Sequence, residues 1–368
     1  MKNISILIKP ASGNCNINCK YCFYKDEMTN RNQASYGMMS IETYENILKI
    51  FFNLHDIKNI NIAFQGGEPM LRGISFFQEI INIEKKINPG IKVSYSIQTN
   101  GTLLSDEWCK FYKESNFLVG ISLDGIKKTH DINRLTTTNE GTFSLVVQNI
   151  KKLKEYEINY NILTVITKDI VYNIDEIYNF YKENDFKYVQ FIPCLNSLSD
   201  SKSYLYPHDF EIFLNKLFNL YYNDIIKGNY LYNRYFENLL CILLGENPED
   251  CSLKGNCSLQ YVIEANGNVY PCDFYAIDKY YLGNINKDNI KDLNLNLIKS
   301  KFIDDSYLLN QSCSKCEYIN LCRCGCRRMR NKNYKNMYCS SYFNFFKKNY
   351  NKLIKLKNLI KSQKIKLN

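Results

Sequence analysis

Residues 4–22, ISILIKPASGNCNINCKYC, decide the fold, because a strand-like apolar run leads directly into three closely spaced cysteines. Cys15, Cys19 and Cys22 form a C-x3-C-x2-C loop. Three thiolates in so short a loop can hold three irons of a cubane cluster and leave the fourth iron open to a ligand from solution. The alternative is a structural zinc loop, but structural zinc takes four closed ligands, and no nearby His or further Cys supplies the fourth.

The composition is that of a globular chain. It has 368 residues, 45% of them apolar, which is enough for one large core and a smaller second domain. The first residues, MKNISILIKP, lack the apolar segment and cleavage site of a signal peptide, and no apolar run is long enough to span a membrane. We therefore expect a cytoplasmic protein, in which the 15 cysteines bind metal or do redox chemistry rather than form disulfides.

The formal net charge of +10 is concentrated at the C-terminus. Residues 347–368 contain eight Lys and no Asp or Glu, so the rest of the chain is nearly neutral. Apolar residues recur in this tail at a roughly helical spacing, which predicts a basic surface helix over 341–368. Binding to RNA or to a membrane surface is the alternative. We expect neither a nucleic acid nor a membrane as a partner.

Strand-like and helix-like segments alternate six times between residues 4 and 227. Such alternation indicates a parallel sheet, either doubly wound or curled into a barrel. Residues that could take part in binding or catalysis follow all six strands, as in a barrel whose active site lies at the carboxyl ends of its strands. Six units are too few for a closed eight-stranded barrel, so we predict an α/β fold with an open, partial (β/α)6 TIM-like barrel. The expected helices span residues 41–54, 75–87, 105–115, 142–156, 172–184 and 208–227.

The pattern changes after about residue 230. A short helix is expected at 234–244, followed by a β-hairpin that turns at Asn266-Gly267 and leads into Cys272 and Asp273. Six more cysteines follow with little regular structure between them, where metal must substitute for a core. The expected domains are a partial barrel over 1–230, a cysteine-rich domain over 231–340 and a basic C-terminal helix over 341–368.

Several motifs resemble a known enzyme family. CNINCKYCFY, FQGGEP, QTNG, SLDG and the two-part cysteine tail look like a radical S-adenosylmethionine enzyme with a SPASM-type C-terminal domain. KPASGNCNINCKYCFY, QTNGTLL, FLVGISLDG, YPCDFY and CRR resemble more closely the anaerobic sulfatase-maturating enzymes, along nearly the whole chain. The resemblance implies that a 5′-deoxyadenosyl radical abstracts the Cβ hydrogen of a peptidyl Cys or Ser of a sulfatase, which becomes Cα-formylglycine. It also implies S-adenosylmethionine as cosubstrate and three 4Fe-4S clusters.

The resemblance extends to residues around the cosubstrate. The glycines of the GGEP motif let backbone approach a ligand closely. Ser122 can donate to ribose or carboxylate oxygens, Arg134 can pair in forked fashion with a carboxylate, and Leu195 would lie against adenine. Each residue also has an ordinary structural alternative, such as a turn serine, a surface arginine or a core leucine. The implied cosubstrate shell comprises Tyr21, Gly67, Ser122, Arg134 and Leu195.

By the same resemblance, two auxiliary 4Fe-4S clusters each take four cysteines. The first would be held by Cys251, Cys257, Cys272 and Cys326, and the second by Cys313, Cys316, Cys322 and Cys339. Fully ligated clusters cannot bind substrate, so these would serve electron transfer and stability. Cys324 departs from the family pattern, which has a non-cysteine there, and could displace Cys326 as a ligand. The spacing of Cys326 and the Arg327-Arg328 that follow it match the family and favour Cys326.

Oxidation of a Cβ thiol or hydroxyl to a thioaldehyde or aldehyde removes one hydrogen atom, one proton and one further electron. A radical, a carboxylate and a redox centre can take these in turn. Asp273, directly after Cys272, matches the position of the family's general base. The alternative is an aspartate that caps a turn or orients a cluster ligand. Polar residues at other strand ends could bind peptide or cosubstrate, or cap loops: Gln65, Gln98, Asn100 and Asp124.

The implied partners are a sulfatase polypeptide that carries a C-x-P-x-R or S-x-P-x-R motif and a small electron donor such as flavodoxin or ferredoxin. One alternative is another SPASM-type peptide-modifying enzyme that forms a thioether or other crosslink and need not keep an acid beside the hairpin cysteine. Another is a zinc-stabilised basic RNA-binding protein. Asp273 and the motifs at the strand ends favour the sulfatase-maturating activity.

Overall fold

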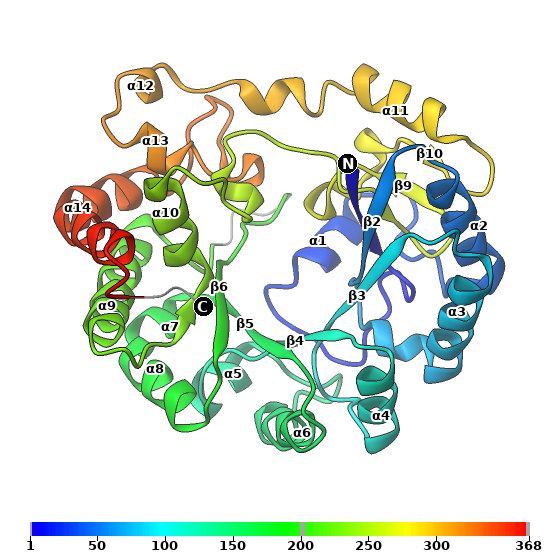
Figure 1. The fold of residues 1–368 in the computed structure, drawn as a ribbon, viewed down its shortest axis with the longest axis horizontal. Coiled ribbons are helices and arrows are strands. Elements are labelled where there is room, and N and C mark those ends of the chain that lie inside the picture. The colour runs from blue at the N-terminus through cyan, green and yellow to red at the C-terminus, as the bar shows by residue number, and fades with distance from the viewer. Residues whose placement is uncertain (1, 199–202, 366–368) are drawn as a thin grey trace. The chain divides into compact units, whose positions relative to one another are not determined.

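The computed structural model describes residues 2–198 and 203–365 (Figure 1). The chain forms two compact units, and each combines segments that are distant in the sequence. The first unit comprises Met1–Ser122, Asp131–Tyr160 and Leu259–Phe302, and the second comprises Leu123–His130, Asn161–Ser258 and Ile303–Asn368. Residues 366–368 of the expected C-terminal helix lie outside the described residues. The domain limits expected at residues 230 and 340 stay a prediction.

A parallel sheet forms the centre of the first unit. Neighbouring strands pair in parallel from β1 to β4, and the side chains of Ile6, Ile8, Ile60 and Ile62 on β1 and β2 are at most 1% exposed. These buried residues alternate along each strand, so they share one face of the sheet. The strands are β1 (Lys2–Ile8), β2 (Ile57–Phe64), β3 (Lys92–Thr99) and β4 (Leu118–Ser122).

The crossover helices of this unit begin and end within two residues of the predicted limits. Side chains fix two of the starts, because Ser40 accepts a hydrogen bond from the Thr43 backbone N–H and Ser105 accepts one from that of Trp108. The buried face of each helix carries Phe, Ile, Leu, Tyr or Trp at helical spacing. The helices are α2 (Ile41–Phe52), α3 (Ile74–Ile87), α4 (Asp106–Glu114) and α6 (Phe143–Glu155).

The predicted hairpin forms, and it joins the sheet of the first unit. Strands β8 (Val262–Ile263) and β9 (Asn268–Tyr270) are antiparallel, and β10 (Gly283–Asn284) pairs with β9. The sequence did not indicate that β8 would also pair in parallel with β1, through Leu7 and Ile8. The Lys9 backbone N–H donates to the Ile263 carbonyl at 2.8 Å. This pairing brings the segment after β9 close to the end of β1.

The second unit contains two more strand and helix pairs, as predicted. Its strands β5 (Tyr160–Ile166) and β6 (Tyr188–Pro193) are parallel, and the two-residue strand β7 (Tyr232–Asn233) pairs with β6. Its helices include two that the sequence predicted after these strands and one at 234–244. They are α8 (Ile174–Glu183), α9 (Pro207–Ile226) and α10 (Arg234–Leu244).

The C-terminal helix α14 (Cys339–Lys361) packs on α9. Ser341 donates to the Pro207 carbonyl at 2.5 Å, while Phe345 and Leu353 are fully buried. The apolar residues therefore face the unit and many of the lysines stay exposed. No helix in the described part of the chain is both long enough and apolar enough to cross a bilayer.

Candidate active site

The three-cysteine loop is held by backbone pairing to a distant segment of the same unit. It connects β1 to α1 (Phe23–Thr29), with Cys22 as the residue that precedes the helix. The Asn18 N–H donates to the Leu135 carbonyl at 2.6 Å, and the Lys20 N–H donates to the Asn133 carbonyl at 3.0 Å. The loop around the cysteines is therefore tied to a segment more than 100 residues later in the sequence.

The same contact places Arg134 against the cysteines. Its Nη1 lies 3.8 Å from the Cys19 Sγ, and its guanidinium carbon lies 5.5 Å from the centre of the Tyr21 ring. Arg134 is only 6% exposed, which speaks against an ordinary surface arginine. Two residues of the expected cosubstrate shell thus lie together at the loop.

Asn100 contacts the loop from the end of β3. Its Nδ2 lies 3.8 Å from the Cys15 Sγ and donates to the Asn16 Oδ1 at 2.9 Å. The pKa of the Cys15 thiol is raised to about 11, mainly by burial and also by the nearby charges of Glu68 and Cys22. A buried thiol with a raised pKa is inert unless a cation or metal stabilises its thiolate.

Gly67 brings the end of β2 against the same loop. Its φ of 54° lies in the left-handed region, and a Cβ there would clash with the carbonyl oxygens of Asn14 and Ser12. The Glu68 N–H donates to the Asn14 carbonyl at 2.8 Å. The position next to the cysteine loop therefore requires glycine, which supports a special role for the GGEP motif over an ordinary turn.

Glu68 ties the ends of two strands together. Its carboxylate is fully buried and accepts hydrogen bonds from the Asn100 N–H at 2.8 Å, the Thr99 hydroxyl at 2.8 Å and the Met70 N–H at 3.1 Å. Burial raises the pKa of Glu68 to about 7, although these hydrogen bonds favour the ionised form. The residue is a structural support of the loop.

We expect Gly67→Ala to destabilise the protein, because the added methyl group would clash with the backbone before the cysteine loop. The clash and the positive φ together should cost about 2 kcal/mol or more of unfolding free energy. Gly37→Ala is the matched control, because Gly37 also has a positive φ of 77° but nothing lies within 4 Å of an added Cβ. Denaturant midpoints of both variants check this, and equal losses would contradict it.

For Ser122 and Leu195, the other two residues of the expected cosubstrate shell, the structure gives contacts outside the cysteine loop. Ser122 ends β4 and accepts a hydrogen bond from the Gln98 Nε2 at 3.1 Å. Leu195 follows β6 in the second unit, where its carbonyl accepts from the Cys194 thiol at 3.7 Å. Asp124 supports the neighbouring strand β5: its Oδ1 accepts a hydrogen bond from the Val165 N–H at 3.0 Å.

Asp273 lies in a buried polar site of the first unit. It begins the 3₁₀ turn η3 (Asp273–Tyr275), and its two carboxylate oxygens have different partners. Oδ1 forms an ion pair with the Lys9 ammonium, and Oδ2 accepts from the Gln65 Nε2 at 2.6 Å. Lys9 is fully buried, and its Nζ lies 3.9 Å from the centre of the Tyr24 ring.

Sequence reasoning missed Lys9. The signal was a lysine directly after a buried strand, in a position that needs a buried counter-charge. The partner could not be identified from the sequence because it is 264 residues away.

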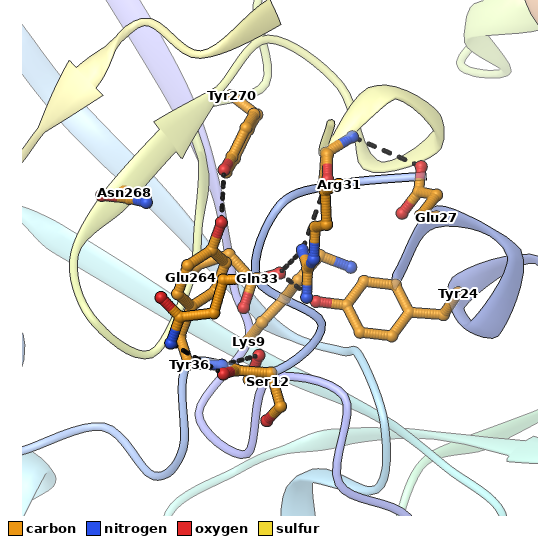
Figure 2. A network of polar contacts seen from close by, with 12 residues as sticks. Lys9, Ser12, Tyr24, Glu27, Arg31, Gln33, Tyr36, Glu264, Asn268 and Tyr270 are labelled. Atoms are coloured by element: carbon orange, nitrogen blue, oxygen red, sulfur yellow. Dashed lines mark hydrogen bonds and ion pairs between the residues drawn. The ribbon is translucent and has the colours of Figure 1, made fainter. Parts of the chain in front are cut away.

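A second buried ion pair supports this site from the side of α1 (Figure 2). The Arg31 Nη1 lies 2.7 Å from the Glu264 Oε1, and the Tyr24 hydroxyl donates to the same carboxylate. Arg31 also donates to the Ala276 carbonyl at 3.3 Å, while the Ala276 N–H donates to Glu27 at 3.3 Å. Burial raises the pKa of Glu27 well above its ordinary value, and the Lys9 charge opposes that rise. These contacts join the helix after the cysteine loop to the turn that carries Asp273.

Three cysteines of the expected first auxiliary set gather in the second unit. Burial raises the pKa of Cys326 to about 12, and the neighbouring thiols of Cys251 and Cys257 raise it as well. The Cys257 N–H donates to the Ser306 hydroxyl at 2.8 Å. Cys272 follows β9 in the first unit.

Cys324 lies near the cysteines of the expected second auxiliary set. The pKa of Cys313 is raised to about 11, mainly by burial and also by the nearby thiols of Cys324, Cys339 and Cys316. Burial also raises the pKa of Cys322 to about 12, again with Cys324 as a neighbour. Cys324 therefore lies in this group, whereas Cys326 lies beside Cys251 and Cys257.

Arginine side chains stabilise the irregular backbone around both groups. Arg330 donates to the carbonyls of Ser306 at 2.7 Å and Gly325 at 2.9 Å, and Arg323 donates to that of Leu253 at 3.1 Å. Guanidinium groups can satisfy several carbonyls at once. These arginine hydrogen bonds satisfy backbone carbonyls that are outside regular helices and strands.

The donor chemistry fits iron–sulfur clusters. All fifteen cysteines are free thiols, and thiolates are the usual ligands of such clusters. Across residues 2–198 and 203–365, no three His, Cys, Asp or Glu side chains converge closely enough to hold one metal ion. Cluster ligands bind different irons, so they need not converge on one point.

Comparisons with known proteins agree with this arrangement. Residues 10–183 match the model of the radical SAM superfamily, and residues 251–317 match that of the SPASM iron-sulfur cluster-binding domain. A cysteine-type anaerobic sulfatase-maturating enzyme of Clostridium novyi (strain NT) is 48% identical over 363 residues, which cover 96% of this chain and 97% of that protein. A serine-type enzyme of Bacteroides thetaiotaomicron is 29% identical and aligns over 94% of this chain and 89% of its own length.

A solved structure has the same fold. Native anSMEcpe with bound AdoMet and Cp18Cys peptide superposes with a TM-score of 0.91 at 40% identity and covers 98% of this chain and 100% of its own. The matches confirm the predicted α/β fold with a parallel sheet and a C-terminal iron–sulfur domain.

Proposed function

This chain belongs to the radical S-adenosylmethionine family of anaerobic sulfatase-maturating enzymes, and from that premise we propose that it oxidises a peptidyl cysteine of a sulfatase to Cα-formylglycine. The observation that carries the proposal is Asp273, a carboxylate held by a buried lysine and by Gln65. A cysteine substrate is favoured over serine because identity is 48% to the cysteine-type relative and 29% to the serine-type relative.

We propose three metal sites because the cysteine pattern resembles that of the family and because Cys251 and Cys257 lie near Cys326. Cys15, Cys19 and Cys22 would hold the 4Fe-4S cluster with an open iron, which together with S-adenosylmethionine supplies a 5′-deoxyadenosyl radical that abstracts the Cβ hydrogen. The first auxiliary cluster is assigned to Cys251, Cys257, Cys272 and Cys326, and the second to the group that contains Cys313, Cys316, Cys322 and Cys339. This makes three clusters.

Asp273 is the proposed proton acceptor. A carboxylate that is fixed through both oxygens has a defined orientation, which a general base requires. The Lys9 ammonium balances its charge in a buried site, and Gln65 orients the second oxygen. The remaining electron would leave through the auxiliary clusters, and water would then hydrolyse the resulting thioaldehyde to formylglycine with release of hydrogen sulfide.

The cosubstrate shell is proposed to comprise Tyr21, Gly67, Ser122, Arg134 and Leu195. Arg134 has the forked guanidinium that suits a carboxylate, and its place beside Cys19 supports a role there. Gly67 brings backbone close to the cysteine loop without a side chain in the way.

The proposed partners are a sulfatase segment with a C-x-P-x-R motif and a small electron donor of the flavodoxin or ferredoxin kind. Support for a peptide partner comes from the solved relative, which was captured with AdoMet and the Cp18Cys peptide. Peptides that carry C-x-P-x-R or S-x-P-x-R distinguish a cysteine substrate from a serine substrate.

The proposed function is tested by anaerobic incubation of the two peptides with the iron-loaded protein, reductant and S-adenosylmethionine. Mass spectrometry should find an aldehyde in place of the cysteine side chain, with the serine peptide converted at least ~10-fold more slowly. A peptide that stays unmodified, or that gains an internal crosslink, would refute the proposal.

Lys9→Met should lower aldehyde formation by about 10- to 100-fold, because Asp273 loses its buried partner. 5′-Deoxyadenosine formation should persist, since Lys9 contacts none of the three cysteines. Lys128→Met removes an exposed ion pair with Glu176 and serves as the control. The ratio of aldehyde to 5′-deoxyadenosine is the measurement, and an unchanged ratio in Lys9→Met would argue against the positioning role.

A further inference from the structure

Two buried ion pairs of the first unit meet at Tyr24. The Tyr24 hydroxyl donates to Glu264 (Figure 2), and the Lys9 ammonium lies 3.9 Å from the centre of the Tyr24 ring. Lys9 pairs with Asp273, whereas Glu264 pairs with Arg31. Lys9 and Glu264 therefore contact the same side chain, although each has a different ionic partner.

The backbone sets Lys9 and Glu264 next to each other. Ile8 on β1 pairs with Ile263 on β8, and the Lys9 N–H donates to the Ile263 carbonyl at 2.8 Å. Because side chains alternate along a strand, the two residues that follow this pair point to the same face. Both Lys9 and Glu264 are fully buried. An ammonium and a carboxylate thus share one buried site without pairing with each other.

Glu264 has an oxygen that could accept a further donor. Its Oε1 accepts from Arg31 at 2.7 Å and from Tyr24, whereas its Oε2 is buried and has no hydrogen-bond partner among the described residues. A buried carboxylate needs a counter-charge, because an ionised group is costly to remove from water. Arg31 supplies that charge. If Arg31 were neutral, Lys9 would be the remaining cation in contact with the Tyr24 ring.

We propose that Arg31 is a positioning residue for the reaction, because by neutralising Glu264 it leaves the Lys9 ammonium to Asp273. The inference rests on the proposed function, in which Asp273 is the proton acceptor. When Arg31 loses its charge, the Lys9 ammonium turns from Asp273 to the Oε2 of Glu264, and Asp273 loses the partner that orients it. Neutralising Glu264 as well removes the competition and returns Lys9 to Asp273.

Neutral variants of the full-length, iron-loaded protein test this role. Arg31→Gln keeps a hydrogen-bond donor but removes the charge, so the ratio of aldehyde to 5′-deoxyadenosine should fall at least ~10-fold. Arg31→Lys keeps the charge, and the double variant Arg31→Gln with Glu264→Gln removes both charges. Both should give a ratio within about threefold of wild type. A merely structural loss at Arg31 would not be relieved by a second substitution in the same buried site.

Arg72→Gln is the matched control in the same unit. The Arg72 Nε donates to the Met39 carbonyl at 2.8 Å, and Arg72 has no carboxylate partner among the described residues. Its replacement should leave the ratio unchanged. Arg31→Met is prepared in parallel with Arg31→Gln and should show the same loss, so that the test does not depend on the folding of one variant.

Crystal structures of the same variants identify the partner of Lys9 without turnover. The Lys9 Nζ should contact Glu264 in Arg31→Gln, and Asp273 in wild type and in the double variant. The proposal is overturned if Lys9 still pairs with Asp273 in Arg31→Gln or moves to Glu27 instead. It is also overturned if the Arg31→Gln ratio stays at the wild-type level, or if the double variant does not recover.

The outcome is separable from that of the proposed function. A wild-type protein that makes no aldehyde would refute the proposed reaction, whereas the crystal structures would still decide whether the charge of Arg31 determines the partner of Lys9.

Discussion

Asp273→Asn should still cleave S-adenosylmethionine but should make formylglycine at least about 100-fold more slowly than wild type. The amide keeps the shape of the side chain but cannot accept the proton in the same way, and it no longer balances the Lys9 charge. The measurement is the yield of aldehyde and of 5′-deoxyadenosine in the same anaerobic reaction.

The control for Asp273→Asn is Asp292→Asn, an exposed residue in the first turn of α11 (Ile290–Lys299). It should leave both products unchanged. Aldehyde formation by Asp273→Asn at the wild-type rate would remove Asp273 from its proposed role. A loss of both products together would indicate a structural role beside Cys272 instead.

Replacement of Cys15, Cys19 and Cys22 by Ala should reduce 5′-deoxyadenosine to the background of a reaction without protein. Iron should fall from about twelve to about eight per chain, because the auxiliary clusters use other cysteines. Cys241→Ala, a cysteine of α10 outside all three groups, is the control and should change neither value. Cofactor cleavage that persists in the triple variant would contradict the assignment of the open cluster.

The regular part of the fold could be predicted because its signals are local. The alternation of strand-like and helix-like segments placed α2, α3, α4 and α6 to within two residues. The parallel pairing of β8 with β1 could not be predicted, because β8 has two residues and its partner lies more than 250 positions earlier. This pairing is what brings the hairpin, and with it Asp273, to the end of β1.

The candidate site was predictable where its residues form motifs and not where they form buried pairs. The C-x3-C-x2-C loop and the glycines before Glu68 are visible in the sequence. Lys9 and Arg31 look like surface cations until their partners, which are 264 and 233 residues away, are known. Residue spacing favoured Cys326 for the first group, but it did not indicate that Cys324 would lie near the cysteines of the second group.

The proposed reaction depends most on removal of a hydrogen atom from Cβ of the target cysteine. A C-x-P-x-R peptide with both Cβ hydrogens replaced by deuterium tests this directly. After anaerobic turnover, we expect one deuterium in 5′-deoxyadenosine and one deuterium retained in the aldehyde. Unlabelled 5′-deoxyadenosine alongside a modified peptide would contradict it, because the hydrogen would then have come from another atom.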